Sequence, residues 1–301
     1  MNMLLCMVSR NLKIFLKDKA NIFFSLLCPL IVLALYVLFL GKVQVDNLNA
    51  ALAETGVSGA ESAVQAFCDS WMLAGALSSA CITVPLCACG VMVQDKKRGI
   101  VNDIAASPVP AWLAPASYFL SVAAAGLVLC TGVMLLAFGC LAVSGSWCLS
   151  VSDAFAAVGV MVLSVVSSSA LLVFIVGFLK SEGAFTGVNV ILGTVVGFLI
   201  GAYMPLSMFP AGVQYFTAFI PRRASAGLMR NFIMGGALDE IAALSSPEFA
   251  AGLAEEFSFD LNFFGRAVPP AVMAAVVAGA AVLFAGLFFL VRFLSAKKGV
   301  K

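Results

Sequence analysis

The sequence predicts an all-α, polytopic membrane protein with six transmembrane helices. Of its 301 residues, 62% are hydrophobic and 11% are charged, and the mean hydropathy is +1.09. Soluble domains carry about 25% charged residues, so this chain lacks the polar side chains that a water-exposed surface needs. The composition therefore excludes a soluble enzyme, a disordered chain and a disulfide-stapled mini-protein, and the net charge of +2 argues against a nucleic-acid partner.

Six apolar stretches are long enough to cross a bilayer, which takes about 20 residues in a helix. They cover residues 22–40, 71–93, 114–143, 154–179, 184–204 and 268–294. Because only residues 180–183 separate the fourth stretch from the fifth, these two are expected to form a tight helical hairpin. The short alternating segments that are typical of a membrane β-barrel do not occur.

The distribution of lysine and arginine predicts the orientation, since cytoplasmic loops carry an excess of both. Placing both termini in the cytoplasm puts most of the 17 basic residues on that side. The first stretch contains Pro29 and exceeds the about 7–15 residues of a signal-peptide core, so we expect a retained anchor. The expected location is the cytoplasmic (inner) membrane, with multiple passes.

Residues 1–21 have the pattern of a basic amphipathic helix that leads into the first span. Its apolar arc contains Leu4, Leu5, Val8, Leu12, Phe15 and Leu16, and its polar arc contains Asn2, Ser9, Arg10, Lys13 and Lys17. Such a helix would lie in the cytoplasmic interface of the membrane. A positively flanked segment that only directs insertion explains the same pattern equally well.

The loop at 94–110, between the second and third spans, combines charges with a short apolar face. The residues of interest are Gln94, Asp95, Lys96, Lys97, Arg98, Gly99, Ile100 and Asp103. Ser107-Pro108 would end any helix that forms here. The loop is either a short helix that docks in a groove of a partner or a solvated turn.

The fifth span carries a stripe of three glycines, Gly193, Gly197 and Gly201, spaced four residues apart. Such a stripe lets another helix approach closely, so it predicts either a dimer interface or close packing within one subunit. Serine and threonine residues in several spans mostly bond back to their own helices. A minority of them would line a weakly polar route that suits an amphiphile.

Residues 205–267 are too apolar at their start for a free loop, and we expect one or two short re-entrant helices in the outer leaflet, followed by an acidic loop. The residues of interest are Pro205, Phe209, Pro210, Pro221, Arg222, Arg223 and Arg230. The arginines would either contact lipid phosphate or line an exit vestibule.

Several kinds of chemistry have no candidate residues. The chain has no histidine and no G-x-x-x-x-G-K-[ST] loop, so we expect no catalytic residue, no metal site and no cofactor. The nine cysteines are expected to pack as small apolar residues. Cys68 and Cys148 are both expected in outer loops, where a disulfide would be possible.

Taken in order, these features resemble the permease subunits of type-2 ABC transporters. The likeness rests on the basic segment 10–19 before a first span with Pro29, the stretch 95–99 with its Ser107-Pro108 ending, and the region 205–230. The chain departs from the usual pattern at Asp95, where a glutamate is common, and at Ile100, where a threonine is frequent.

The resemblance implies two six-helix protomers, identical or homologous, that bind two cytoplasmic ABC ATPase subunits. The 94–103 loop would be a coupling helix held by the ATPase, and the N-terminal helix would rest on the same subunit. The first and fifth spans would face the other protomer, and a hydrophobic or amphiphilic substrate (drug-like, lipid or glycolipid) would pass between protomers. The alternatives are a secondary carrier or channel without an ATPase, and an intramembrane lipid-modifying enzyme, for which no carboxylate, histidine or metal cluster is evident.

Overall fold

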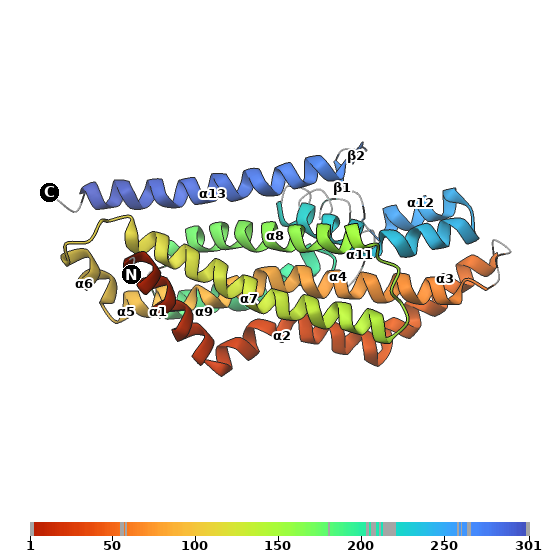
Figure 1. The fold of residues 1–301 in the computed structure, drawn as a ribbon, viewed down its shortest axis with the longest axis horizontal. Coiled ribbons are helices and arrows are strands. Elements are labelled where there is room, and N and C mark those ends of the chain that lie inside the picture. Colours follow the sequence, from red (N-terminus) through yellow and green to blue (C-terminus); the bar gives the residue numbers. More distant parts are fainter. Residues whose placement is uncertain are drawn as a thin grey trace.

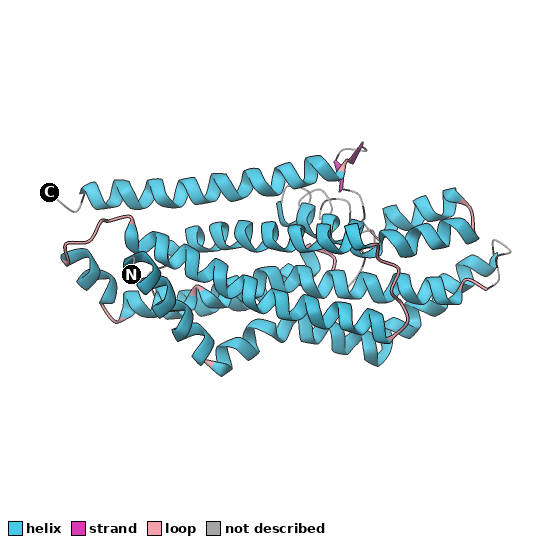
Figure 2. Cartoon of the chain, viewed as in Figure 1, coloured by secondary structure: helices cyan, strands magenta, loops and turns pink. Residues whose placement is uncertain are grey.

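The computed structural model is almost entirely helical (Figure 2), which confirms the all-α prediction. It describes residues 3–54, 57, 59–179, 181–202, 205, 209, 210, 212, 221–257, 259, 261–263 and 266–298. The described residues also include one small antiparallel hairpin, β1 (Leu261–Phe263) and β2 (Arg266–Val268), in which Leu261 lies opposite Val268.

Within the part of the chain that the structure describes, six helical stretches are long and apolar enough to cross a membrane, as expected. They are Lys19–Glu54, Glu61–Lys97, Leu113–Val143, Val151–Gly177, Glu182–Leu199 and Pro270–Val291. The first consists of α2 (Lys19–Leu35), the π-helical turn η1 (Tyr36–Leu40) and α3 (Gly41–Glu54), and the second of α4 (Glu61–Ala88) and α5 (Gly90–Lys97). The others are α7 (Leu113–Val143), α8 (Val151–Gly177), α9 (Glu182–Leu199) and α13 (Pro270–Lys298).

The first two helical stretches extend further than their apolar sequence predicts. The hydrophobic run ends at residue 40, yet the helix continues to Glu54, and the second begins at Glu61 rather than at 71. The polar residues after position 40 end the apolar stretch but do not end the helix. Backbone hydrogen bonds and packing against α4 stabilise α3 even though its sequence is polar.

The fifth helix is shorter than predicted and ends at Leu199 instead of 204. Gly201 has φ +69°, and the amides of Gly201 and Ala202 donate to the carbonyls of Phe198 and Gly197 at 3.0 and 2.8 Å. This pair of bonds is a Schellman motif, which closes a helix at a left-handed glycine. Gly201 therefore has a local role in ending α9.

Helix α4 forms the centre of the protein, with α2, α7, α8 and α11 (Pro221–Leu244) packed around it. The most apolar window of the second span is 100% buried, whereas that of the fifth span is 11% buried. A helix that is apolar on all sides is stable only when neighbours or lipid surround it. The contrast shows that α4 is covered by the protein and that α9 leaves most of its surface for lipid or another chain.

The two ends of the bundle differ in what they carry (Figure 1). The chain ends, α5 and α6 (Ile100–Ala106) lie at one end, and α3 and α12 (Pro247–Glu256) lie at the other. Helix α1 (Met3–Lys17) meets α2 at an angle at Asp18 and packs against α7. Re-entrant helices were predicted at the start of the region 205–267, and most of that start, up to residue 220, lies outside the described residues.

Candidate functional site

The α5–α6 loop forms a turn because Gly99 adopts φ +77°, a left-handed conformation that side chains disfavour. A Cβ added to Gly99 would have space, because no atom beyond the adjacent residues lies within 4 Å of it. The need for glycine at this position therefore comes from the backbone conformation alone. Helix α6 follows at once and buries none of its residues. The turn therefore presents α6 at the surface of this end of the molecule.

Asp95 anchors this loop inside the protein. Its side chain is 3% exposed and accepts hydrogen bonds from both terminal nitrogens of Arg10, one at 2.8 Å, and from the hydroxyl of Tyr118 at 2.8 Å. The hydrogen bond to Asp95 raises the pKa of Arg10 above its usual value, which favours the charged form of the guanidinium group. One carboxylate thus joins α1, α5 and α7.

The position of Arg10 corrects the expectation for the N-terminal helix. The pattern placed Arg10 on the polar, solvent-facing arc, but the structure turns it toward Asp95, beside the buried Asn11 and Phe15. The helical wheel groups residues by polarity alone, so it cannot identify a charged residue that finds a buried partner.

Lys96 ties the same loop to the end of α8. Its ammonium group lies 2.7 Å from the carbonyl oxygen of Gly177, 3.1 Å from that of Leu179 and 3.4 Å from that of Val176. The last carbonyls of a helix lack partners within the helix and carry its negative dipole end, so a cation is favourable there. Lys96 is therefore an electrostatic cap on a helix to which it does not belong.

The remaining charges of the loop face outward. Lys97 pairs with Glu182, the first residue of α9, at 2.5 Å, and both side chains are exposed. Arg98 and Asp103 are also exposed, and Gln94 and Ile100 are half-buried. Among the predicted coupling residues, Asp95 and Lys96 thus anchor the loop to the protein. Lys97, Arg98 and Asp103 face outward.

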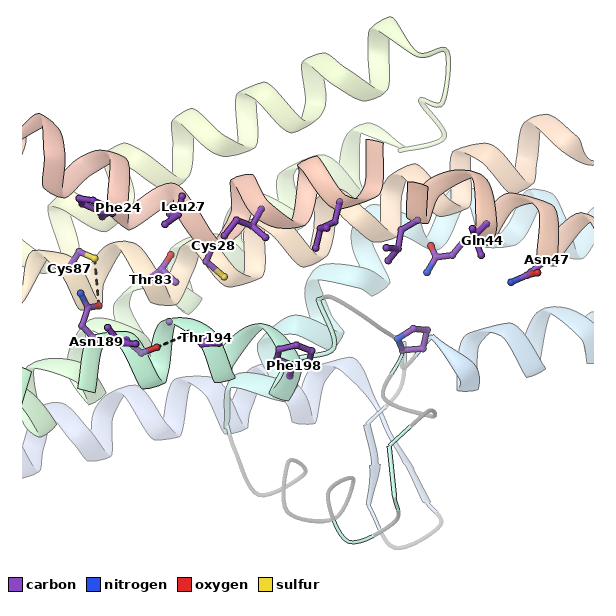
Figure 3. Close-up of a pocket in the computed structure, with 17 residues that line it drawn as sticks. Phe24, Leu27, Cys28, Gln44, Asn47, Thr83, Cys87, Asn189, Thr194 and Phe198 are labelled. Carbon is purple, nitrogen blue, oxygen red and sulfur yellow. Dashed lines mark hydrogen bonds between the residues drawn. The ribbon is translucent and has the colours of Figure 1, made fainter. Parts of the chain in front are cut away.

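A second feature is a lateral cavity of about 880 Å³ (Figure 3). On one side lie α2, η1 and α3, and on the other lie α4 and α9. Its apolar lining includes Phe24, Leu27, Ile31, Leu35, Leu40, Val43, Val190, Phe198 and Pro205. Among the described residues, its polar lining consists of Gln44, Asn47, Thr83, Asn189 and Thr194, together with the thiols of Cys28 and Cys87.

The glycine stripe of α9 divides between two environments. Gly193 lines the cavity, and an added Cβ there would meet nothing within 4 Å. Gly197 is buried in the protomer, and Gly201 closes the helix. The structure of one chain therefore gives Gly197 and Gly201 roles within the subunit and leaves Gly193 open.

Two of the outer arginines are buried. Arg230 is 2% exposed and donates to the carbonyl oxygens of Ile200 and Gly201 at 2.8 and 2.7 Å, so α11 caps α9 from the side. Arg223 is also buried. Pro221 begins α11, Phe209 is half-buried and Pro210 is exposed, whereas the side chain of Arg222 is outside the described residues.

No disulfide joins Cys68 and Cys148, because both are free thiols. Cys68 was expected in an outer loop, but α4 begins at Glu61, so Cys68 lies within that helix. Its side chain is fully buried. Cys148 is half-buried and its sulfur lies 3.3 Å from a carboxylate oxygen of Glu240.

Sequence reasoning missed Tyr118 and Glu182 at the loop and Gln44 in the cavity. Tyr118 gave one signal, because it is one of four tyrosines in the chain and lies within an otherwise apolar span. A buried tyrosine hydroxyl needs a partner, so its position pointed to a polar neighbour.

Comparison with known proteins gives one finding. No curated protein matches this chain. The family described as ABC-2 family transporter protein matches residues 42–294, which exclude α1 and α2 but include the loop, α9 and most of α13. Since that match covers most of the 301 residues, the chain belongs to the ABC-2 transporter family, the membrane-embedded permease subunits of ABC transporters.

Proposed function

We propose that this protein is the permease subunit of an ATP-driven exporter, which moves a hydrophobic or amphiphilic substrate across the cytoplasmic membrane. Both termini and the α5–α6 loop would face the cytoplasm, where a separate ABC ATPase subunit binds. The observation that carries the proposal is the construction of that loop, whose anchoring charges point inward while α6 stays uncovered. Such a surface suits a docking element that transmits force.

The anchoring contacts explain how the loop would drive the helices. A displacement of α5–α6 acts on α1 and α7 through Asp95, and on the ends of α8 and α9 through Lys96 and Lys97. Helix α9 lines the cavity, so its movement changes the cavity's shape. ATP binding would then shift the balance between inward-open and outward-open states, by as much as the ATPase differs in affinity for the two.

A second protomer, identical or homologous, would cover the exposed apolar faces of α2 and α9. Leu38 on the first span is 75% exposed, and Val190 and Ile191 on α9 are 62% and 61% exposed. Of these residues, Val190 also lines the cavity. The cavity would therefore lie at the junction between two protomers, with lipid around the remaining surface.

Reconstitution in lipid vesicles tests the proposal. The chain alone is expected to move no substrate uphill, and to stimulate the ATPase and support ATP-dependent transport once that subunit is added. Uphill transport without the ATPase would identify a secondary carrier instead.

Substitution at the turn tests the role of the loop. Gly99→Ala strains the left-handed turn by about 1 kcal/mol and should reduce the stimulation of ATP hydrolysis several-fold. Gly132→Ala on α7, which has equal space for a Cβ and no positive φ, is the matched control. If both variants stimulate ATP hydrolysis equally, the turn at Gly99 is not part of the coupling between the ATPase and the permease.

A further inference from the structure

We propose that the segment between α7 and α8, residues 144–150, is a latch across the end of the bundle opposite α6, and that Gly236 on α11 is its seat. Figure 1 shows this segment crossing from the end of α7 to the start of α8. When the latch is seated, it fixes α11 to α4, and when it lifts, α11 is free to shift. In the exporter the latch would control opening on the outer side, so the inference rests on the proposed function.

The latch contacts α11 through its backbone, at a position that only glycine permits. A Cβ added to Gly236 would lie 1.8 Å from the carbonyl oxygen of Cys148 and 2.9 Å from its carbonyl carbon. Any side chain at position 236 therefore has to push the latch away from α11, because a backbone carbonyl cannot turn aside as the end of a flexible side chain can. Four residues further along α11, Glu240 accepts a hydrogen bond from the Cys148 thiol at 3.3 Å.

The part of the latch next to α7 is fastened to α4. Ser146 is 3% exposed, and its hydroxyl donates a hydrogen bond to Asp69 of α4 at 2.8 Å. The same carboxylate accepts a hydrogen bond from Tyr36 at 3.0 Å, which joins the first span to this point. The latch therefore connects α4 and the first span to α11.

Helix α11 carries this connection on to α9, because Arg230 donates to the carbonyl oxygens of Ile200 and Gly201. The first span and α9 lie on opposite sides of the lateral cavity (Figure 3). Helix α11 also packs directly against α4, and its buried residues are mostly apolar. Apolar packing has no preferred direction, whereas the seat and the two hydrogen bonds of the latch specify one position of α11.

Both ends of the latch are closed by the helices that they adjoin. After α7, Gly145 adopts φ +71°, and the amide of Ser146 donates to the carbonyl of Leu141 at 3.1 Å. At the start of α8, the hydroxyl of Ser150 accepts a hydrogen bond from the amide of Asp153 at 3.2 Å. The middle of the latch can therefore lift without unwinding α7 or α8.

Lifting the middle of the latch breaks contacts of modest strength. Trp147 is exposed, Cys148 is half-buried and Leu149 is buried, so lifting exposes one large apolar side chain. Glu240 is exposed, and water would hydrate its carboxylate once the thiol withdraws. Neither of the two ion pairs among the described residues involves the latch.

Labelling of Cys148 by fluorescein maleimide reports whether the latch is seated. The measurement uses the full chain in phosphatidylcholine nanodiscs with Cys6→Ser and Cys140→Ser, which leaves Cys148 and six buried cysteines. Gly236→Ala should speed the labelling at least about fivefold, since a lifted latch exposes the thiol. Gly235→Ala is the matched control, because a Cβ added there would meet nothing within 4 Å. Equal rates for the two variants would overturn the proposal.

A second pair of variants tests the fastening to α4. Ser146→Ala removes the hydrogen bond to Asp69 and should speed the labelling of Cys148 about threefold. Ser144→Ala is the control, since its exposed hydroxyl donates to its own helix, at 2.9 Å to the carbonyl of residue 140. If Gly236→Ala does not fold, this pair decides, and equal labelling of the two serine variants contradicts the latch.

Adding Cys148→Ser to Gly236→Ala separates a lifted latch from a loosened fold. The cysteines that remain are buried, so labelling should then stay slow. Fast labelling of this variant would mean that the whole bundle has opened, and it would contradict a local latch.

The ATP-driven cycle tests whether the latch lifts when the protein works. With the ATPase subunit bound, ATP should speed the labelling of Cys148 several-fold when Gly236 is retained. Stimulated ATP hydrolysis with unchanged labelling would show that the latch stays seated, and it would overturn the proposal. If hydrolysis is not stimulated, the exporter is contradicted, and the comparison of Gly236→Ala with Gly235→Ala then decides the latch by itself.

Discussion

The second helical span, Glu61–Lys97, carries an aspartate near each end, and the two are held in different ways. Asp95 at the loop end is buried, pairs with Arg10 and accepts a bond from Tyr118. Asp69 at the opposite end is half-buried and accepts only from neutral donors in the described structure: Tyr36 at 3.0 Å, Gln65 at 2.9 Å and Ser146 at 2.8 Å.

The difference indicates which end of the bundle is more strongly stabilised by its polar contacts. A buried ion pair loses much when one partner is removed, because the remaining charge is left without compensation. Neutral hydrogen bonds contribute about 1 kcal/mol each and can be replaced by water where the site is half-exposed. The loop end is therefore held firmly to α1 and α7, whereas the opposite end can rearrange at lower cost.

Arg10→Gln is the change with the largest expected effect. It leaves the Asp95 carboxylate buried, and the unfolding free energy should fall by about 2 kcal/mol, which is less than for a fully buried pair because the Arg10 side chain is 38% exposed. Thermal or denaturant unfolding in detergent measures this loss. The double variant Arg10→Gln with Asp95→Asn should recover part of it, and an additive loss would show that the two residues do not interact.

Lys96→Met should have the next largest effect. It removes a cation from the terminal carbonyls of α8, at a cost of about 1 kcal/mol, and should weaken the stimulation of ATP hydrolysis. Lys97→Met is the control, because the exposed pair with Glu182 contributes about 0.5 kcal/mol or less. If the two variants stimulate ATP hydrolysis equally, the contact between Lys96 and the end of α8 has no role in coupling.

At the opposite end, Tyr36→Phe removes one of three donors to Asp69 and should cost about 1 kcal/mol or less. Asp69→Asn should cost no more, since the amide oxygen still accepts from Tyr36 and Gln65 while the new amide nitrogen donates to the hydroxyl of Ser146. If Asp69→Asn lowers the unfolding free energy as much as Arg10→Gln does, the proposed difference between the two ends is wrong.

The smallest effect concerns Cys148, whose reactivity also reports which end faces outward. Burial, and then its hydrogen bond to Glu240, raise the pKa of this thiol to about 11, so little thiolate exists at neutral pH. Labelling of intact cells by a membrane-impermeant maleimide should be slow and should accelerate about tenfold per pH unit below that value.

Glu240→Gln should lower the pKa of Cys148 and speed its labelling. Cys148→Ser, made in a Cys140→Ser background because Cys140 is also exposed, should abolish the signal from this end. Cys6 on α1, at the loop end, is exposed and should stay unlabelled until the membrane is opened. Labelling of Cys6 in intact cells would reverse the proposed orientation.

The fold was largely predictable because bilayer crossing imposes a simple requirement on a chain. All six spans were found, since each needs a long apolar stretch that satisfies its own backbone. Their outer boundaries were not, because α3 and the start of α4 are polar helices supported by packing. The resemblance from the residues at 95–99 and 205–230 agreed with the family that the chain matches.

The sequence by itself determined the spans and the charged loop, since hydropathy and charge act over neighbouring residues. Only the tertiary structure decided that Arg10 meets Asp95 from 85 residues away, that Lys96 caps α8, and that Gln44 and Thr194 line one cavity. These contacts depend on how helices pack in three dimensions. Many different pairings of helices satisfy the same hydrophobic pattern, so the pattern alone does not select among them.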